Sequence, residues 1–200
     1  MKIGVLGGTF DPPHLGHIKL AERAKKQLNL GRVLFIPAGQ PWMKTGISVT
    51  PAHHRLSMVQ LAIDGNPSFE VSDLEIKRMG PSYSIDTLEN LAKTRGPVEM
   101  TFIMGEDALE DLHRWHEVDR FLGMCDLAFY RRGKREAVED ERVVVDSVEL
   151  GQLAIPLEGP SIEISSSDIR RRSALRLSLV NLVHPSVETY IDQHRLYVSK

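Results

Sequence analysis

The stretch "GGTFDPPHLGH", residues Gly7 to His17, joins the first predicted strand of this chain to its first predicted helix. An apolar run precedes it, and apolar residues at helical spacing follow it. A strand that turns into a helix brings exposed backbone N–H groups and the positive end of the helix dipole to one place. Gly7 and Gly8 let a ligand approach the main chain closely. The stretch therefore predicts a phosphate site, although similar turns in other folds bind nothing.

Two histidines, His14 and His17, stand three residues apart on the first turn of this helix. Both imidazoles can therefore face one ligand, and Gly16 leaves the surface between them open. An H-x-x-H pair can also hold zinc, with His53 or His54 as a third ligand, but no carboxylate or thiolate stands at a familiar ligand spacing. We predict no metal site. The stretch also differs from the Walker loop and from the G-x-G-x-x-G dinucleotide pattern.

Composition favours one soluble domain without a nucleic-acid or membrane partner. The chain has 200 residues, 42% of them hydrophobic, with 25 basic and 27 acidic residues and a formal charge of −2. No broad basic field is available for nucleic acid, and no segment approaches the roughly 20 apolar residues of a membrane span. The N-terminal apolar run is too short for a signal peptide, and the single cysteine, Cys125, reads as a buried small hydrophobe. We expect a cytoplasmic protein, and the sequence is compatible with an oligomer.

Short apolar runs rich in Ile, Val and Phe alternate with longer segments of helical period, which is typical of helices crossing between parallel strands. The runs are mostly continuous rather than alternating, as expected for strands covered on both faces. The fold class predicted is therefore α/β. The predicted strands are Lys2 to Leu6, Arg32 to Ile36, Phe69 to Ile76, Met100 to Met104, Asp126 to Tyr130 and Leu153 to Leu157.

Capping signals delimit the predicted helices. The first has Asp11 as its N-cap, Pro12 at its first position and Gly31 just past its end. The second begins with Thr50 and Pro51 in the same two roles. A third helix follows Tyr83 and ends at Gly96, and further helices are predicted after Gly105, after Glu117, after Ser166 and after Pro185. The charged stretch from Arg131 to Gly151 is predicted to be a loop.

Two motifs resemble those of a known enzyme superfamily. Within "GTFDPPHLGH", the residues His14, Leu15, Gly16 and His17 resemble the (H/T)-x-G-H signature of the nucleotidyltransferases. Near the other end, "EISSSDIRRR", Glu163 to Arg172, resembles their companion serine motif, which supplies phosphate contacts from a second helix start. Taken alone, the serine stretch also fits an ordinary capped helix. The two motifs stand in the order that the superfamily has.

Further stretches along nearly the whole chain resemble the bacterial nicotinate-nucleotide adenylyltransferases. These are "IPAGQPWMK" (36–44), "RLSMVQLAI" (55–63), "GPSYSIDTLENL" (80–91), "FIMGEDALEDLHRW" (102–115) and "HPSVETYIDQHRLY" (184–197). The last stretch is interpreted as packing. "PWMK" stands where many relatives have "PPHK", which leaves Lys44 as the obvious cation of that loop.

The resemblance implies a Rossmann-like, doubly wound, mostly parallel sheet with helices on both faces. It implies a single domain over residues 1–200, with a C-terminal helical part (about 160–200) packed on it. The activity implied is transfer of the adenylyl group of ATP to nicotinate mononucleotide, with Mg2+ accompanying ATP. Related enzymes with another acceptor, nicotinamide mononucleotide or phosphopantetheine, and a non-catalytic adenylate sensor are the alternatives. Whether an acid or an amide is preferred depends on the orientation of one or two backbone groups.

The resemblance also implies site residues. The predicted catalytic residues are His14, His17, Lys44 and Arg170. Those predicted to bind ATP are Gly7, Gly8, Thr9, Phe10, Gly16, Gly105, Asp107, Ser165 and Ser166. Those predicted to bind the nicotinate nucleotide are Tyr83, Ser84 and Trp115. Packing is an equal alternative for Tyr83 and Trp115, and helix capping is one for Asp107. His53, His54, His113 and His116 are interpreted as surface or structural residues.

Overall fold

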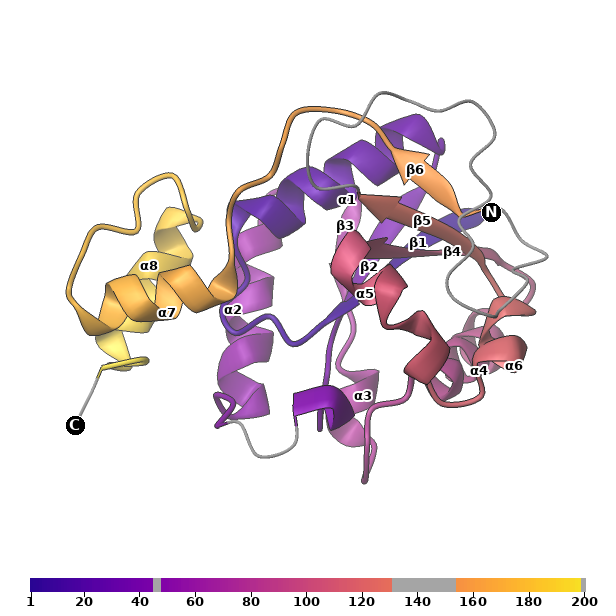
Figure 1. The fold of residues 1–200 in the computed structure, drawn as a ribbon, viewed down its shortest axis with the longest axis horizontal. Helices are drawn as coiled ribbons and strands as arrows, with labels where there is room; N and C mark the ends of the chain where they lie inside the picture. The colour runs from indigo at the N-terminus through magenta and orange to yellow at the C-terminus, as the bar shows by residue number, and fades with distance from the viewer. Residues whose placement is uncertain (45–47, 131–153, 199–200) are drawn as a thin grey trace.

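The computed structural model describes residues 1–44, 48–130 and 154–198, and its centre is a six-stranded sheet (Figure 1). All neighbouring strands pair in parallel, in the order β3-β2-β1-β4-β5-β6. This confirms the α/β prediction and the Rossmann-like arrangement. The strands are β1 (Lys2–Gly8), β2 (Arg32–Pro37), β3 (Phe69–Val71), β4 (Glu99–Gly105), β5 (Asp126–Tyr130) and β6 (Ile155–Leu157).

Helices fill the connections between the strands. They are α1 (Leu15–Gln27), α2 (Ala52–Ile63), α3 (Leu74–Lys77), α4 (Ser84–Arg95), α5 (Glu106–Glu110), α6 (Val118–Leu122), α7 (Ser166–Ala174) and α8 (Pro185–Gln193), with short 3-10 helices η1 (Trp42–Lys44) and η2 (Leu112–Arg114). The helices predicted after Tyr83, Gly105, Glu117, Ser166 and Pro185 are confirmed to within a residue. None of the helices in the described ranges is long and apolar enough to cross a membrane.

Helices cover the sheet on both faces, as predicted. On one face, α1 and α2 pack on apolar side chains that include Leu6, Phe35 and Ile103. On the other face, α4 and α6 pack on a cluster that includes Val5, Phe102 and Phe129. Cys125 lies buried in this second cluster directly before β5, which confirms its interpretation as a small hydrophobe, and burial raises the pKa of its thiol to about 12.

The C-terminal helices α7 and α8 extend the α1–α2 side of the molecule (Figure 1). Their apolar side chains, among them Ile169, Val187 and Ile191, pack on Met58 and Ala62, which lie on the α2 surface turned from the sheet. This third cluster joins α7, α8 and the residues beside them to α2. The single-domain organisation of residues 1–200 with this appended part stays a prediction.

The first two helices begin later than predicted. Helix α1 starts at Leu15 with His14 as its N-cap, so the assignment of Asp11 as N-cap and of Pro12 as first helical residue was wrong. The reason is that Pro13 disfavours helical backbone at the residue before it. Pro51 is the N-cap of α2, one residue later than the predicted Thr50.

The third predicted strand is shorter than expected. The strand β3 ends at Val71, and the helix α3 occupies residues predicted to continue it to Ile76. Asp73, a residue type that favours helix starts, precedes α3, and its carbonyl accepts the N–H of Lys77. Of the predicted strand 153–157, residue 153 lies outside the described residues, as does the loop predicted for 131–151.

Substituting Gly39 should destabilise the fold, because a Cβ at this position would collide with the carbonyl oxygen of Glu75. Backbone atoms cannot rotate away, so we expect Gly39→Ala to lower the free energy of unfolding by about 1–3 kcal/mol. Urea titration measures this. In Gly105→Ala the new methyl group meets nothing within 4 Å, and a change within about 0.5 kcal/mol is expected. Equal losses in both variants would contradict the argument.

Candidate active site

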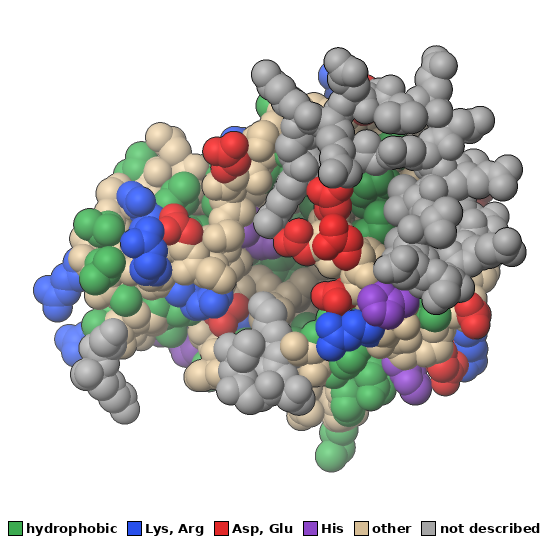
Figure 2. All heavy atoms as spheres, in the orientation of Figure 1, with side chains coloured by type: hydrophobic (Ala, Val, Ile, Leu, Met, Phe, Trp, Pro, Cys, Tyr) green, Lys and Arg blue, Asp and Glu red, His purple; other side chains and the backbone are tan. Residues whose placement is uncertain are grey.

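The candidate site lies where the carboxyl ends of the central strands meet. The chain leaves β1 through α1 on one face of the sheet and reaches β4 through α4 on the other. In open parallel sheets, ligands bind at the carboxyl edge where the winding reverses in this way. In Figure 2, the middle of the visible face is hollowed, with carboxylate and imidazole side chains at its border.

The two histidines of the first turn face each other. The backbone N–H of His14 donates to Nδ1 of His17 at 3.1 Å, and the two rings stack with centroids 3.7 Å apart. Phe10, which is buried, packs edge-on against His17 with centroids 4.9 Å apart. Because Nδ1 of His17 accepts a hydrogen bond, the proton of the neutral ring is assigned to Nε2. This turn thereby presents His17 Nε2–H as a donor.

Gly16 is required by the packing around this turn. A Cβ there would lie 2.8 Å from Nδ1 of His14 and 2.8 Å from a methyl group of Ile162. Real Cβ atoms do not make contacts that short, so glycine allows the segment before α7 to pack against the start of α1. At Gly7 and Gly8, the nearest side chains are those of Phe102 and Phe10.

The start of α7 contacts the same turn from the far end of the chain. Arg170 Nη1 donates to the carbonyl of Asp11 at 2.7 Å, and the Ser166 hydroxyl donates to the carbonyl of Pro12 at 2.8 Å. Ser165 caps α7 by accepting the N–H of Asp168 at 3.2 Å. The structure therefore brings Arg170, Ser165 and Ser166 to the histidine turn. Ser166 donates its single hydroxyl proton to the Pro12 carbonyl. The backbone N–H groups at the start of α7 are therefore the donors of this segment that could bind a phosphate.

Asp11 connects this turn to two further segments. It is 3% exposed. Its Oδ1 accepts the hydroxyl of Tyr197 at 2.7 Å, and its Oδ2 accepts the N–H of Thr50 at 3.2 Å. Burial, and then the Asp11 charge, raise the pKa of the Tyr197 hydroxyl, so it stays protonated and donates. Asp11 thus stabilises the tertiary structure of the turn instead of capping α1.

Arg55 holds three loops together beneath the site. It is 1% exposed, and its guanidinium donates to the carbonyls of Thr50 and Thr9 at 2.8 Å each and of Gly39 at 3.2 Å. Burial lowers the pKa of Arg55, and the nearby charge of Asp11 opposes that shift. The segments after β1 and after β2 are therefore fixed relative to each other by one buried cation.

A second polar network ties the loop after β2 to the start of α4. Ser82 Oγ accepts the N–H groups of Gly39 at 2.9 Å and of Gln40 at 3.1 Å. The buried carboxylate of Glu75 accepts the Thr87 hydroxyl at 2.5 Å and also interacts with Ser82. The N-cap of α4 is Tyr83, so this network positions the residues predicted to meet the nicotinate ring.

Aromatic side chains gather around Tyr83. Its ring stacks on His116 with centroids 4.2 Å apart, and Trp42 lies 6.1 Å away. Trp115 is partly buried and packs on Phe102 and Phe121, so packing accounts for part of its surface. The structure therefore brings Tyr83, Ser84 and Trp115 to one region and adds His116 to it.

The remaining predicted residues lie on neighbouring segments of the carboxyl edge. Gly105 ends β4 and is the N-cap of α5, so the alternative in which Asp107 caps this helix was wrong. Asp107 lies exposed in the first turn of α5. Lys44 is the last residue of η1.

Comparison with known proteins places the chain in a family. A family model described as cytidylyltransferase-like matches residues 5–172. A protein of Dehalococcoides mccartyi, named probable nicotinate-nucleotide adenylyltransferase, is 44% identical over 98% of this chain and 97% of its own. One of Thermomicrobium roseum with the same name is 42% identical over 98% and 91%. The chain belongs to the bacterial nicotinate-nucleotide adenylyltransferase family. The resemblance of its motifs to that family is thereby confirmed.

Solved structures support the fold of this adenylyltransferase family member. A Plasmodium falciparum nicotinic acid mononucleotide adenylyltransferase complexed with NaAD has a TM-score of 0.79, at 20% identity over 98% of this chain and 97% of that one. A putative nicotinate-nucleotide adenylyltransferase from Vibrio parahaemolyticus has a TM-score of 0.71, at 19% identity over 100% and 96%. At these identities, the likeness concerns the fold.

Sequence reasoning missed several residues that this family member places around the site. Arg55 precedes the inward-facing Val59 and Ile63 by four and eight residues, so helical spacing already put it on the buried face. His116 was interpreted as a surface or structural residue, and Tyr197 was part of a stretch interpreted only as packing. No sequence signal indicates their partners, Tyr83 and Asp11, because these contacts depend on the tertiary fold.

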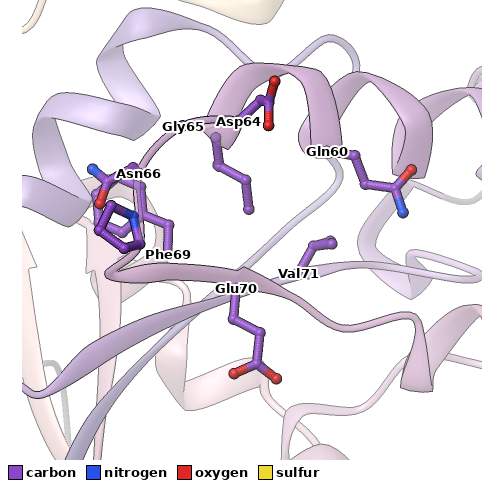
Figure 3. A pocket seen from close by; sticks show the side chains of 9 residues that line it. Gln60, Asp64, Gly65, Asn66, Phe69, Glu70 and Val71 are labelled. Carbon is purple, nitrogen blue, oxygen red and sulfur yellow. The ribbon is translucent and has the colours of Figure 1, made fainter.

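A separate hollow of about 440 Å3 lies beside the edge strand β3 and the end of α2 (Figure 3). In this view, the Glu70 side chain points away from α2, and its carboxylate binds Arg32 and Arg95. The hollow is lined by Gln60, Ile63, Asp64, Gly65, Asn66, Pro67, Phe69, Glu70 and Val71. These residues are distinct from those of the candidate site.

Removing the Tyr197 hydroxyl should weaken the turn that carries the histidines. In Tyr197→Phe the buried Asp11 carboxylate loses a donor at 2.7 Å, so we expect unfolding free energy to fall by about 1.5–3 kcal/mol in a urea titration. Tyr190→Phe is the matched control, because the Tyr190 hydroxyl pairs with a ring nitrogen of His54 at 3.0 Å, and burial lowers the pKa of that imidazole, which disfavours its charged form. A loss of about 0.5–1.5 kcal/mol is expected. A Tyr197→Phe variant as stable as the wild type would refute the role given to this contact.

Replacing Glu75 tests the second network through its pH dependence. Burial raises the pKa of Glu75 above its ordinary value of 4.5, against hydrogen bonds from Thr87 and Ser82 that lower it. A raised folded-state pKa gives stability that is present at low pH and is lost as the pH rises through that pKa. Glu75→Gln cannot ionise, so its stability relative to the wild type should increase between pH 4 and pH 7.

Denaturant titrations at several pH values measure this difference. Glu75→Ala is the comparison variant: it cannot ionise either, so its curve should run parallel to that of Glu75→Gln, but it removes the partner of the Thr87 and Ser82 hydroxyls and should lie about 1–3 kcal/mol below Glu75→Gln at every pH. A Glu75→Gln curve parallel to the wild-type curve would show that Glu75 ionises no differently in the folded and unfolded states.

Proposed function

We propose that the protein transfers the adenylyl group of ATP to the phosphate of nicotinate mononucleotide, giving nicotinate adenine dinucleotide and pyrophosphate. The observation that carries the proposal is the convergence of Arg170 with the His14–His17 turn, through the 2.7 Å bond to the Asp11 carbonyl. The substrate follows from the relatives named nicotinate-nucleotide adenylyltransferase, which match nearly the whole chain.

The proposed reaction needs alignment and charge neutralisation more than acid–base chemistry. The attacking group is a phosphate that is already largely dianionic at neutral pH. One of its oxygens forms a bond to the α-phosphorus of ATP, and the bond from that phosphorus to the bridging oxygen breaks, releasing pyrophosphate. No proton has to move, so preorganised donors and cations suffice.

On the ATP side, His14 and His17 are assigned as donors to the phosphate oxygens. The backbone N–H of His14 donates to Nδ1 of His17 at 3.1 Å and so fixes the orientation of the His17 ring and of its Nε2–H. A donor that is already oriented needs less reorganisation during the reaction. Arg170 and Lys44 are assigned to the β- and γ-phosphates. The remaining contacts of ATP are assigned to Gly7, Gly8, Thr9, Phe10, Gly16, Gly105, Asp107, Ser165 and Ser166.

On the acceptor side, the backbone at Tyr83 and Ser84 is assigned to the nicotinate carboxylate. Trp115 is assigned to the pyridine ring, and the 4.2 Å stack of Tyr83 on His116 borders the same region. The Gly39–Ser82 and Gly39–Arg55 bonds join this region to the ATP side, which supports one cleft for both substrates.

Magnesium is proposed to accompany ATP as part of the substrate. Within the described ranges, no group of three or more His, Cys, Asp or Glu side chains is placed to hold a metal. Mg2+ prefers phosphate oxygens and water, so it would arrive on ATP and neutralise part of the triphosphate charge. The single thiol of the chain supports the cytoplasm as the proposed compartment, because unpaired cysteines suit reducing conditions.

Turnover measured by pyrophosphate release tests the proposed function. The protein is incubated with ATP, magnesium and, separately, nicotinate mononucleotide, nicotinamide mononucleotide or phosphopantetheine. We expect turnover with the nicotinate form. Pyrophosphate release only with another acceptor would show that the protein uses that acceptor instead. Release with none of the three would favour a non-catalytic adenylate sensor.

Replacing His17 should abolish most of that turnover. His17→Ala removes one preorganised donor to the phosphates, so we expect a loss on the order of a hundredfold or more in kcat with the fold intact. The matched control is His113→Ala, because His113 is exposed on η2 and its Nδ1 bonds only a backbone carbonyl in its own turn. Wild-type kcat in His17→Ala would discredit the assignment.

A further inference from the structure

Side chains hold the segment between β6 and α7, residues 158–162, in place. Gln27 on α1 pairs with both main-chain groups of Glu158, because its amide donates to the carbonyl at 2.7 Å and accepts the N–H at 3.1 Å. Arg23, one turn earlier on α1, donates to the carbonyl of Pro160 at 3.0 Å. Between described residues, no backbone–backbone hydrogen bond holds this segment. Its course therefore depends on the side chains that bind it.

Tyr130, at the carboxyl end of β5, binds the part of this segment that is nearest to α7. The Tyr130 hydroxyl accepts the N–H of Ile162 at 2.6 Å and donates its one proton to the carbonyl of Pro160 at 3.4 Å. The Tyr130 ring is buried, and the guanidinium of Arg23 lies over it, 5.0 Å from its centroid. Because a buried, close-packed ring cannot shift far, its hydroxyl fixes the backbone of Ile162 relative to the sheet.

Ile162 lies against the histidine turn. A Cβ on Gly16 would lie 2.8 Å from a methyl group of Ile162 and 2.8 Å from Nδ1 of His14, so these two side chains are neighbours there. Ser165, the N-cap of α7, follows Ile162 after only two intervening residues. A link that short couples the positions of the two residues. The position of Ile162 therefore constrains where α7, with Arg170, starts relative to the histidines.

We propose that Tyr130 is a positioning residue, which places the start of α7 and Arg170 for the phosphates of ATP by fixing the backbone of residues 160–162. The inference rests on the proposed function, in which Arg170 binds the β- and γ-phosphates. Without the hydroxyl, the Ile162 N–H loses its acceptor and the Pro160 carbonyl loses a donor, while the apolar contacts of the ring remain. The segment is then free to shift, and a misplacement of about 1 Å is enough to cost about a hundredfold in rate.

The kinetics of Tyr130→Phe in the full-length protein test this inference. With ATP, magnesium and nicotinate mononucleotide, we expect kcat/KM for ATP to fall about tenfold, on the scale of donors displaced by a fraction of an ångström. The KM for nicotinate mononucleotide should stay unchanged. Tyr190→Phe is the matched control, because the Tyr190 hydroxyl bonds His54 on α2 instead, and wild-type kinetics are expected. A urea titration shows whether each variant is folded.

A double-mutant cycle with Arg170→Ala separates positioning from a general loss of structure. If Tyr130 acts through Arg170, the two residues work as a unit, and the losses from their substitutions are not additive. The loss that Tyr130→Phe causes should therefore shrink to about threefold or less in the Arg170→Ala protein. An undiminished loss in this background would overturn the inference, because a merely structural effect adds to the removal of Arg170.

The outcomes separate this inference from the proposed function. If the wild type releases no pyrophosphate with nicotinate mononucleotide, the proposed function fails. If the wild type is active and Tyr130→Phe keeps its kcat/KM for ATP, or Tyr190→Phe loses as much, the inference alone is overturned. Should Tyr130→Phe fail to fold, Arg23→Met replaces it, because it removes the other donor to the Pro160 carbonyl. Its kcat/KM for ATP should fall about threefold, and an unchanged value overturns the inference.

Discussion

The buried carboxylate of Asp11 is the constraint on which the site depends. A carboxylate at 3% exposure is stable only if its oxygens are paired. Its partners are the N–H of Thr50 and the hydroxyl of Tyr197, 39 and 186 residues away in the chain, while Arg170 binds the carbonyl of the same residue from 159 residues away. The histidine turn therefore reaches its geometry only when the loop before α2, the start of α7 and the C-terminal segment are all in place.

Polar networks and apolar clusters have separate tasks in this molecule. The clusters on the two faces of the sheet remove apolar side chains from water and supply most of the stability. Arg55 and Glu75 add interactions that are directional, so they set the relative positions of loops that the clusters leave undetermined. Both residues lie under the carboxyl edge, where a small displacement of a donor would alter the alignment of two anionic substrates.

Prediction from the sequence succeeded where local chemistry and the tertiary fold agree. Five of the six predicted strands appear with at most small changes in their bounds, and α4 begins after Tyr83 and ends before Gly96 as its capping signals indicate. It failed at Asp11, where tertiary partners outcompete the capping role, and at Glu75, which a helix buries although the apolar pattern predicted a strand. In both cases a charged side chain pairs with a group in another element, Asp11 with Tyr197 and Glu75 with Thr87, and no local pattern encodes that partner.

The sequence by itself determined the α/β class, the histidine turn after the first strand and the membership that its motifs indicate, because periodicity, capping and motif spacing are local properties. Only the tertiary structure decided that Arg170 meets this turn, that Arg55 joins the strand ends, and that Tyr130 binds the segment before α7. Hydrogen bonds depend on distance and direction between groups. Those quantities exist only after the chain has brought distant segments together.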